Sequence, residues 1–197
     1  MFLLSKPTQE QIDSIIDRNR NAPFSYEPAG CTKNGQTPVP GFVCDHNRVL
    51  LGHGSDTFAK AKLAIRNWKM FDFDWSHLCW PDVPIESGQV VAATFRHFGF
   101  WSLNLCRIVY VIDDKGTVER FGFAYGTLPE HVERGEEKFT VEWNHDDDSV
   151  WYDILAVSQP AHILARLGYP IARYMQRNFV KESKAAMIRA VSSQVST

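Results

Sequence analysis

Apolar and polar residues alternate with a period of two over much of the second half of the chain, the repeat of a strand with one buried face. On this basis strands are predicted at 89–96, 105–112, 118–125, 137–143 and 150–157, with an earlier strand at 42–52. Polar turns separate several of them, as at Asp113-Asp114-Lys115-Gly116. We therefore expect at least five strands joined mostly by hairpins into an antiparallel, strongly curved sheet.

Two helices are predicted before this sheet. Residues 7–20 combine a cap at Thr8 with an isoleucine stripe at helical spacing, which should lie against the main body. A second helix is expected from Asp56 to about Phe71, after a glycine-rich turn, with Ser55 or Asp56 as its cap. Both helices would therefore cover parts of the sheet.

A long C-terminal helix is predicted from Pro160 to about Val191, in two parts because Gly168 and Pro170 interrupt it. The order of elements is typical of an α+β, helix-grip-like fold, in which a curved antiparallel sheet wraps around that helix. Such a layout leaves a space between sheet and helix. The pattern alone fits an open pocket and a filled core equally well.

Composition agrees with one domain over residues 1–197: 44% of residues are hydrophobic and 13% are aromatic, enough for a sizeable core. Within it we expect the helix at about 7–20, an irregular segment rich in proline, glycine and asparagine at 21–40, and sheet and helices at 41–192. The net charge of −2 argues against a dedicated nucleic-acid binder.

The cysteines form no CxxC pair, and we interpret all of them as reduced thiols. No apolar run is long enough for a spanning helix, and the N-terminal one is too short for a signal peptide. We therefore expect a cytoplasmic protein without a transmembrane segment. GxGxxG and Walker patterns are absent, so no cofactor is predicted.

Glu137 is the most informative candidate for chemistry. It shares its predicted strand face with Phe139 and Trp143, so its carboxylate should point inward. A buried carboxylate must be paired or have a raised pKa, and Arg107 is a candidate partner. Glu137 is then either half of a structural ion pair or a ligand-orienting or acid/base group at a pocket wall, aided by Tyr125.

Two other segments carry candidate site residues. Residues 71–88 alternate aromatics with acids, and Trp75 and Trp80 either line the mouth of a pocket or anchor a loop in the core. His131-x-Glu133 resembles the HxE of zinc deaminases, but the PCxxC that such a site needs is absent. A solvated acidic loop explains the same residues, and we predict no metal site.

Basic residues recur on one face of the C-terminal helix, at spacings of 7, 4, 4 and 3, and they are Arg166, Arg173, Arg177, Lys181 and Lys184. Nine acids lie between Glu130 and Asp153, which makes the charge distribution lopsided. This basic stripe is a solvated face, a partner of the acidic strands, or a surface for anionic lipid or an acidic partner protein.

Four segments together resemble a known family: they read NLCRIVY at 104–110, FAYGTLPEH at 123–131, GEEKF at 135–139 and AVSQP at 156–160. The chain resembles the family catalogued as domain of unknown function 1990, whose usual pattern is close to NPCRVVY, FAYGTLPGHPEXGEERF and AFSRPA. Gln159 stands where the family commonly has Arg, which weakens an anion-binding role there. The resemblance implies a single-domain protein of bacteria and plants, without a particular reaction.

Three functions fit these features. The first is binding of a small, mostly apolar ligand or lipid between sheet and C-terminal helix, through Arg107, Tyr125, His131, Glu137, Trp75, Trp80 and Phe95. The second is an isomerase-, hydratase- or cyclase-like enzyme that uses Glu137 as general acid or base. The third is peripheral docking on a membrane or a partner through the basic stripe.

Overall fold

The computed structural model describes residues 1–33, 35, 39–79, 83–97, 99–129, 131–160 and 169–192. Within them, one antiparallel sheet dominates, and its strands follow the order β2, β8, β7, β6, β5, β4, β3. Their bounds are β2 (Val43–His53), β3 (Ser76–Leu78), β4 (Val90–His97), β5 (Phe100–Asp114), β6 (Val118–Thr127), β7 (Glu133–Asn144) and β8 (Ser149–Pro160). The short β1 (Phe2–Leu3) pairs with β5.

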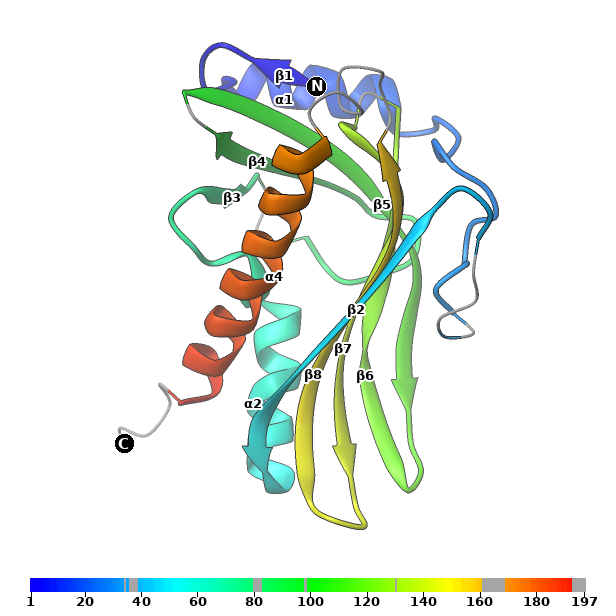
Figure 1. Ribbon diagram of the computed structural model, residues 1–197, viewed down its shortest axis with the longest axis vertical. Helices are drawn as coiled ribbons and strands as arrows, with labels where there is room; N and C mark the ends of the chain where they lie inside the picture. The colour runs from blue at the N-terminus through cyan, green and yellow to red at the C-terminus, as the bar shows by residue number, and fades with distance from the viewer. Residues whose placement is uncertain are drawn as a thin grey trace.

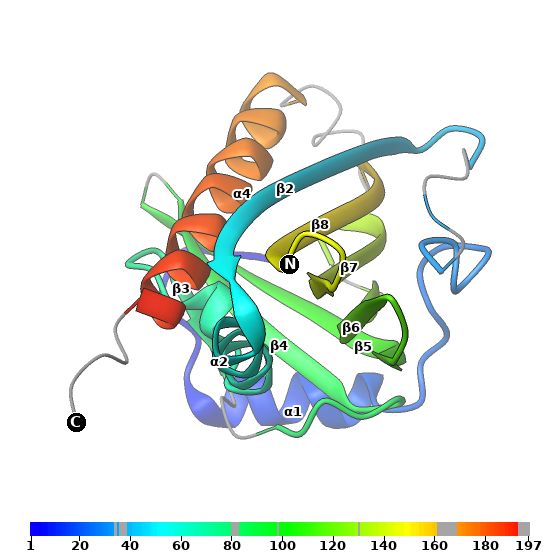
Figure 2. The ribbon, with the colours of Figure 1, turned by 90° about the horizontal axis from the view of Figure 1, so that it is seen from below.

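The sheet curls into an arc, and α4 (Tyr169–Ser192) runs along its open side together with α2 (Gly54–Arg66) (Figures 1 and 2). The predicted α+β helix-grip fold is therefore confirmed. The expected start of the C-terminal helix at Pro160 is wrong, because Pro160 is the last residue of β8 and pairs with Glu133 of β7. The expected helical residues 161–168 lie outside the described residues. None of the described helices has the combination of length and apolarity that crossing a bilayer requires.

The concave face of the sheet holds the main core. Phe123 and Phe139 lie at its centre, where both are fully buried, and strand β8 adds Tyr152 and Ile154. Helix α2 presses Phe58, Ala61 and Ile65 against these residues, and α4 contributes Met187. Burial of so many large apolar side chains on one face fixes the register of the strands.

The convex face carries a smaller core beneath α1 (Gln9–Asn19). A capping box between Thr8 and Gln11 starts this helix at the residue that the sequence singled out. The isoleucine stripe of α1 packs on Leu103 and Leu105 of β5, outside the arc (Figure 2). Apolar residues therefore alternate between two cores along β5, which explains its nearly continuous apolar sequence.

Strand β2 passes directly into α2, because β2 ends at His53 and α2 begins at Gly54. The expected cap at Ser55 or Asp56 is wrong: His53 is the N-cap residue, and its side chain makes no capping hydrogen bond. The helix also ends before Phe71, since Trp68 adopts a left-handed conformation with φ of 55° and a short 3-10 turn, η1 (Lys69–Phe71), follows.

Candidate functional site

A cavity of about 490 Å³ lies between the concave face of the sheet and α4. Strand residues line one side of it, including Asn104 of β5, Tyr125 of β6 and Glu137 of β7, while α4 lines the other with residues such as Gln176 and Phe179. The space that the sequence left undefined is therefore an open pocket. Its wall is partly aromatic and partly polar.

Glu137 faces this cavity, as its strand pattern predicted. It lies opposite Tyr125 across the β6–β7 ladder, and the Tyr125 hydroxyl donates a hydrogen bond of 2.8 Å to the carboxylate. Burial raises the pKa of Glu137 to about 7, with a smaller contribution in the same direction from the negative charges of Glu133 and Asp45, and the hydrogen bond from Tyr125 only partly offsets these effects. The carboxyl group can thus exchange a proton near neutral pH.

Tyr125 stays a neutral donor in this pair. Burial raises the pKa of its hydroxyl well above the usual value, and the charge of Glu137 raises it further. The ring stacks edge-on against Phe139, with 5.4 Å between ring centroids, which holds the hydroxyl in position. The hydroxyl proton in this hydrogen bond therefore stays on Tyr125, and Glu137 is the group of the pair that gains or loses a proton near neutral pH.

Arg107 does not pair with Glu137, so this expectation is wrong. Its guanidinium group lies on the convex face, where it donates hydrogen bonds of 3.2 and 2.6 Å to the carbonyls of Asn19 and Arg20 at the end of α1. It also covers the ring of Phe24, 5.4 Å from the centroid. Successive residues of a strand alternate faces, and Arg107 has the parity of the convex core, whereas Glu137 faces the cavity.

A chain of hydrogen bonds ties the first described turns of α4 to the rim of the cavity. Arg173 forms an ion pair with Asp45 of β2, one of whose contacts is 2.9 Å long, and donates to the Gln176 side-chain oxygen at 2.8 Å. Gln176 donates to Glu133 at 2.7 Å and to Ser158 at 3.3 Å. Arg173 lowers the pKa of Asp45, while burial raises that of Glu133.

His131 also lines the cavity and is neutral there. Burial lowers its pKa to about 3. Its Nδ1 lies 3.0 Å from both the backbone nitrogen and the carbonyl oxygen of Glu133, so it accepts from the N–H in one tautomer and donates to the carbonyl in the other. Among the residues that the structure describes, no cluster of His, Cys, Asp and Glu side chains could hold a metal ion.

The apolar wall is made of three aromatic side chains. Trp75 lies 5.7 Å from Phe95, and Phe95 lies 6.1 Å from Phe179 of α4, measured between ring centroids. All three line the cavity, so Trp75 and Phe95 lie where the sequence placed the wall of a pocket. Trp80, the other tryptophan of that prediction, lies outside the described residues.

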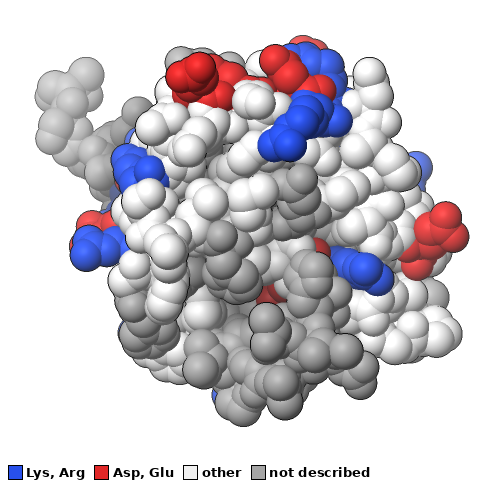
Figure 3. Space-filling view, turned by 90° about the horizontal axis from the view of Figure 1, so that it is seen from above, with Lys and Arg blue, Asp and Glu red and all other residues white. Residues whose placement is uncertain are grey.

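The basic stripe is divided between two environments. Arg173 is engaged with Asp45, whereas Arg177 and Lys181 are exposed at the margin of the cavity, with Lys184 half-buried beside them. Arg166 lies outside the described residues. On the end of the molecule seen in Figure 3, acidic and basic side chains are interspersed in the described part, without a large patch of one sign.

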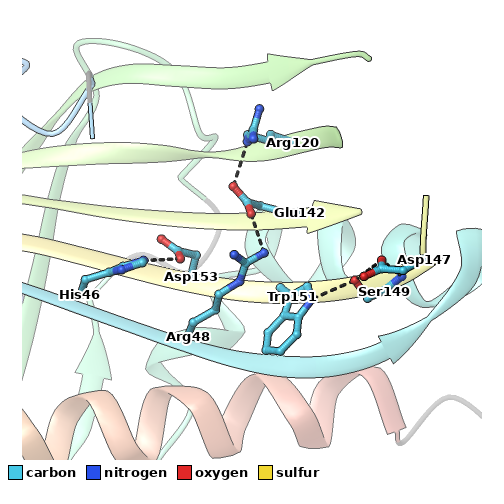
Figure 4. A network of polar contacts seen from close by, with 8 residues as sticks. All are labelled: His46, Arg48, Arg120, Glu142, Asp147, Ser149, Trp151 and Asp153. Atoms are coloured by element: carbon cyan, nitrogen blue, oxygen red, sulfur yellow. Dashed lines mark hydrogen bonds and ion pairs between the residues drawn. The ribbon is translucent and has the colours of Figure 1, made fainter. Parts of the chain in front are cut away.

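The acidic strands find their partners on the convex face instead. Glu142 accepts hydrogen bonds of 2.8 Å from both Arg48 and Arg120, and the His46 ring lies 2.5 Å from Asp153 (Figure 4). These contacts join β2, β6, β7 and β8 on the side away from α4 (Figure 4). Of the described stripe residues, only Arg173 forms an ion pair, and its partner Asp45 belongs to β2.

Two residues of the motif segments gained no role from sequence reasoning. Asn104 lines the cavity and is only 6% exposed. Glu136 is only 2% exposed, on the convex side, where it accepts hydrogen bonds from Tyr26, Thr32 and the backbone N–H of Gly30. The strand pattern assigned Glu136 to the face opposite Glu137, and the segment that covers it there lies about a hundred residues earlier in the chain.

A protein-family model described as domain of unknown function, DUF1990, matches residues 25–186. The chain belongs to the DUF1990 family. The resemblance of the motif segments is thus confirmed, and the match spans all the cavity residues named above. Related DUF1990 chains carry the name UPF0548 protein: one from Dictyostelium discoideum is 36% identical, covering 98% of this chain and 97% of the relative.

Further relatives of this DUF1990 protein come from plants and bacteria. A UPF0548 protein from Arabidopsis thaliana is 31% identical, covering 95% of this chain and 96% of its own. One from Deinococcus radiodurans is 34% identical, with coverage of 96% and 98%. The family therefore extends across bacteria, plants and Dictyostelium with the same overall length.

Solved structures resemble the DUF1990 chain at low sequence identity. Norcoclaurine synthase from Thalictrum flavum, in complex with dopamine and hydroxybenzaldehyde, is 10% identical with a TM-score of 0.49, covering 80% of this chain and 91% of that one. Human STARD10 is 12% identical with a TM-score of 0.44, covering 94% and 81%.

Proposed function

We propose that this protein binds a small, mostly apolar ligand in the cavity between the sheet and α4. The observation that carries the proposal is the cavity itself: about 490 Å³, walled by Trp75, Phe95 and Phe179, with a few polar groups converging on it. Ligand sites in proteins have volumes of roughly 300–1,000 Å³ and combine mostly apolar walls with a few orienting polar groups. The Glu137–Tyr125 pair is the principal orienting group.

The test is a search for ligands combined with a variant that fills the cavity. Native mass spectrometry of protein purified from cells, and a thermal-shift screen of a lipid extract, should reveal a bound mass or a stabilising fraction. Ala156→Phe places a ring in the cavity from β8, whereas Val111→Phe adds the same ring at an exposed position of β5. Binding should be lost in the first variant and kept in the second.

Two results would contradict ligand binding in the cavity. The first is a protein that carries no additional mass and is stabilised by no fraction of a broad panel. The second is a ligand whose stabilising effect is unchanged in Ala156→Phe, because that ligand must occupy another place.

A second candidate function is catalysis of the isomerase, hydratase or cyclase kind. It is favoured by one observation, a carboxyl group with a pKa of about 7 that lines a cavity and is hydrogen-bonded to Tyr125. General acid–base catalysis is most effective when the pKa lies near the working pH. Glu137→Gln should then abolish turnover of a bound compound but leave its binding within a few-fold, whereas unchanged turnover would remove Glu137 from the reaction.

Peripheral docking through α4 stays a prediction. Arg173 is unsuited to test it, because its replacement also breaks the ion pair with Asp45. The test should use Arg177→Glu with Lys181→Glu, both exposed, and vesicles containing anionic lipid. Docking predicts co-sedimentation that salt and the double variant both abolish; binding that neither change affects would dismiss it.

A further inference from the structure

The side-chain oxygen of Asn104 is a buried acceptor that has no partner in the described part of the chain. Its carboxamide nitrogen donates a hydrogen bond of 3.0 Å to the Ser102 hydroxyl oxygen. The residue lines both the main cavity and a small void of about 30 Å³ beside it. Buried polar atoms without partners are rare in folded proteins, and each calls for an explanation.

Tyr125 is hydrogen-bonded to Glu137 and also lies beside the small void that Asn104 lines. It lines the small void together with Asn104, and its single hydroxyl proton is already donated to Glu137. Tyr125 therefore has no proton left to offer to Asn104 or to a ligand. Glu137 accepts this one bond through Oε2, and a carboxylate has capacity for further donors at its other oxygen.

Most other donors near the inner end of the cavity are also engaged. The Arg173 guanidinium group contacts Asp45 and Gln176, and the Gln176 amide donates to Glu133 and Ser158. His131 is uncharged, and when its Nδ1 accepts the backbone hydrogen bond from Glu133, its Nε2 carries the ring proton and is a donor beside the small void. Apart from this ring N–H, the groups with spare capacity at this end of the cavity, Asn104 Oδ1 and the second oxygen of Glu137, are acceptors, and the ligand group that complements them is a donor.

We infer that the inner end of the cavity recognises a hydrogen-bond donor head group, an amine or a hydroxyl, with Asn104 Oδ1 and the Glu137 carboxyl as its acceptors. The inference rests on the proposed function, because it defines the class of the ligand bound there. The body of the ligand is aromatic or aliphatic and lies against the aromatic wall of Trp75, Phe95 and Phe179.

A matched series of probes tests the head group. All members share a naphthylethyl body and end in a primary amine, an alcohol, the methyl ether of that alcohol, or hydrogen. Affinities are measured by calorimetry on the protein comprising residues 1–197. The amine or the alcohol should bind at least about tenfold more tightly than the ether, because only they can satisfy a buried acceptor.

Variants then locate the recognition. In Asn104→Leu, which has similar size but no acceptor, the preference for donor over ether should fall to less than about threefold, with ether binding retained. Glu137→Gln should weaken the amine more than the alcohol, since only the amine gains from a carboxylate. Asn104→Ser, which is smaller, serves where Asn104→Leu does not fold and should likewise reduce the preference.

The possible results separate this inference from the proposed function. Equal or tighter binding of the ether overturns the donor head group and leaves ligand binding in the cavity intact. The same holds if the donors are preferred but the preference is unaffected in all three variants. If no probe binds while a lipid fraction stabilises the protein, the inferred class is wrong; if nothing binds at all, the proposed function fails with it.

Discussion

The surroundings of Glu137 raise the pKa of its carboxyl group to about 7, so both its neutral and its charged form occur near neutral pH. The protein withdraws its carboxyl group from water, and the acids Glu133 on β7 and Asp45 on β2 add repulsion. The arginine that could neutralise it lies on the other face of the sheet. Such a group is costly to ionise in the folded state and cheap to ionise in the unfolded chain.

The first prediction concerns stability against pH. The pKa of Glu137 is raised from 4.5 to about 7, so the folded state retains a proton that the unfolded chain has lost between these values. The stabilisation that comes from burying the protonated carboxyl group of Glu137 is fully present below pH 4.5. It is lost as the pH rises from 4.5 toward 7. Glu137→Gln should therefore gain stability relative to the native protein, by at most about 3 kcal/mol at pH 8.

Urea denaturation at pH 5 and pH 8 measures this difference. Glu86→Gln, at an exposed position, is the matched control and should show no pH-dependent gain. A gain for Glu137→Gln that is equal at both pH values would contradict a raised pKa, because the two side chains would then differ only in packing.

The second prediction concerns the buried carboxylate of Glu136. Tyr26→Phe removes a hydrogen bond of 2.5 Å to it and should cost about 1.5–3 kcal/mol of unfolding free energy, the usual range for a bond to a charged group. Tyr174→Phe, on a ring that is 62% exposed, should cost almost nothing. Similar losses in both variants would place the effect outside this contact.

Gly126 offers an independent test of the same contact. A Cβ atom at this position would lie 2.3 Å from the Tyr26 hydroxyl oxygen, so Gly126→Ala should displace that ring and destabilise the protein as well. In the Tyr26→Phe background the added loss should be smaller, because the hydrogen bond to Glu136 that a displaced ring would break is already absent, although two ring carbons still lie 2.7 and 2.9 Å from the methyl group. Full additivity of the two losses would argue against a shared cause.

At the scale of elements, sequence patterning succeeds where contacts are local and fails where they are not. Strands β4 and β6 to β8 follow from alternation, and β5 follows from its nearly continuous apolar run, which both cores bury. The early end of α2 does not follow, since Trp68 takes a left-handed conformation without a glycine or proline to mark it. Alternation separates the faces of β5 but does not say which one is concave, and this ambiguity produced the wrong partner for Glu137.

The same limit explains Asn104 and Glu136. Glu137 was located because its strand neighbours are aromatic, a signal within one strand. Glu136 is buried by a segment that is remote in sequence, and the unpartnered oxygen of Asn104 depends on what surrounds it in space. Neither the burial of Glu136 nor the lack of a partner for Asn104 among the described residues can be predicted from their neighbours in the sequence.

The third prediction concerns α4, whose two ends are held in different ways. Its first described turns are tied by polar side chains such as Gln176, whereas the later part is anchored by the buried Met187 and by a hydrogen bond of 2.9 Å between Ser183 and Tyr152. Gln176→Leu should accelerate amide hydrogen exchange about tenfold or more over 173–178, before the first residue that packs on the core, Phe179. Exchange over 183–191 should be unchanged.

Tyr174→Leu is the control for this experiment, because it changes an exposed residue of the same helical turn. Exchange that rises evenly along the whole helix in Gln176→Leu would show that α4 opens as one unit. That result would contradict separate anchoring of its two parts.

The whole molecule consists of one sheet with a solid core over part of its concave face and a cavity over the rest. The fourth prediction follows from that cavity, because pressure favours unfolding in proportion to the internal void that unfolding eliminates. Ala156→Phe occupies part of the cavity and should make the volume change of unfolding less negative. Tryptophan fluorescence under hydrostatic pressure measures it.

Val111→Phe is again the control, since it adds the same ring outside the cavity. Its volume change should equal that of the native protein. If filling the cavity has no effect on the volume change, the space is already occupied by water that unfolding merely releases.

The direct passage of β2 into α2 determines which wall of the cavity can move to admit a ligand. An edge strand with a free hinge could swing outward, but β2 has no loop between His53 and Gly54, and α2 is embedded in the core through Phe58 and Ile65. An outward movement of β2 would expose both of these side chains to solvent. We therefore expect the ligand proposed above to enter and leave by an outward movement of α4 around 173–177, where Arg173 and Gln176 hold the helix through polar contacts that water can replace.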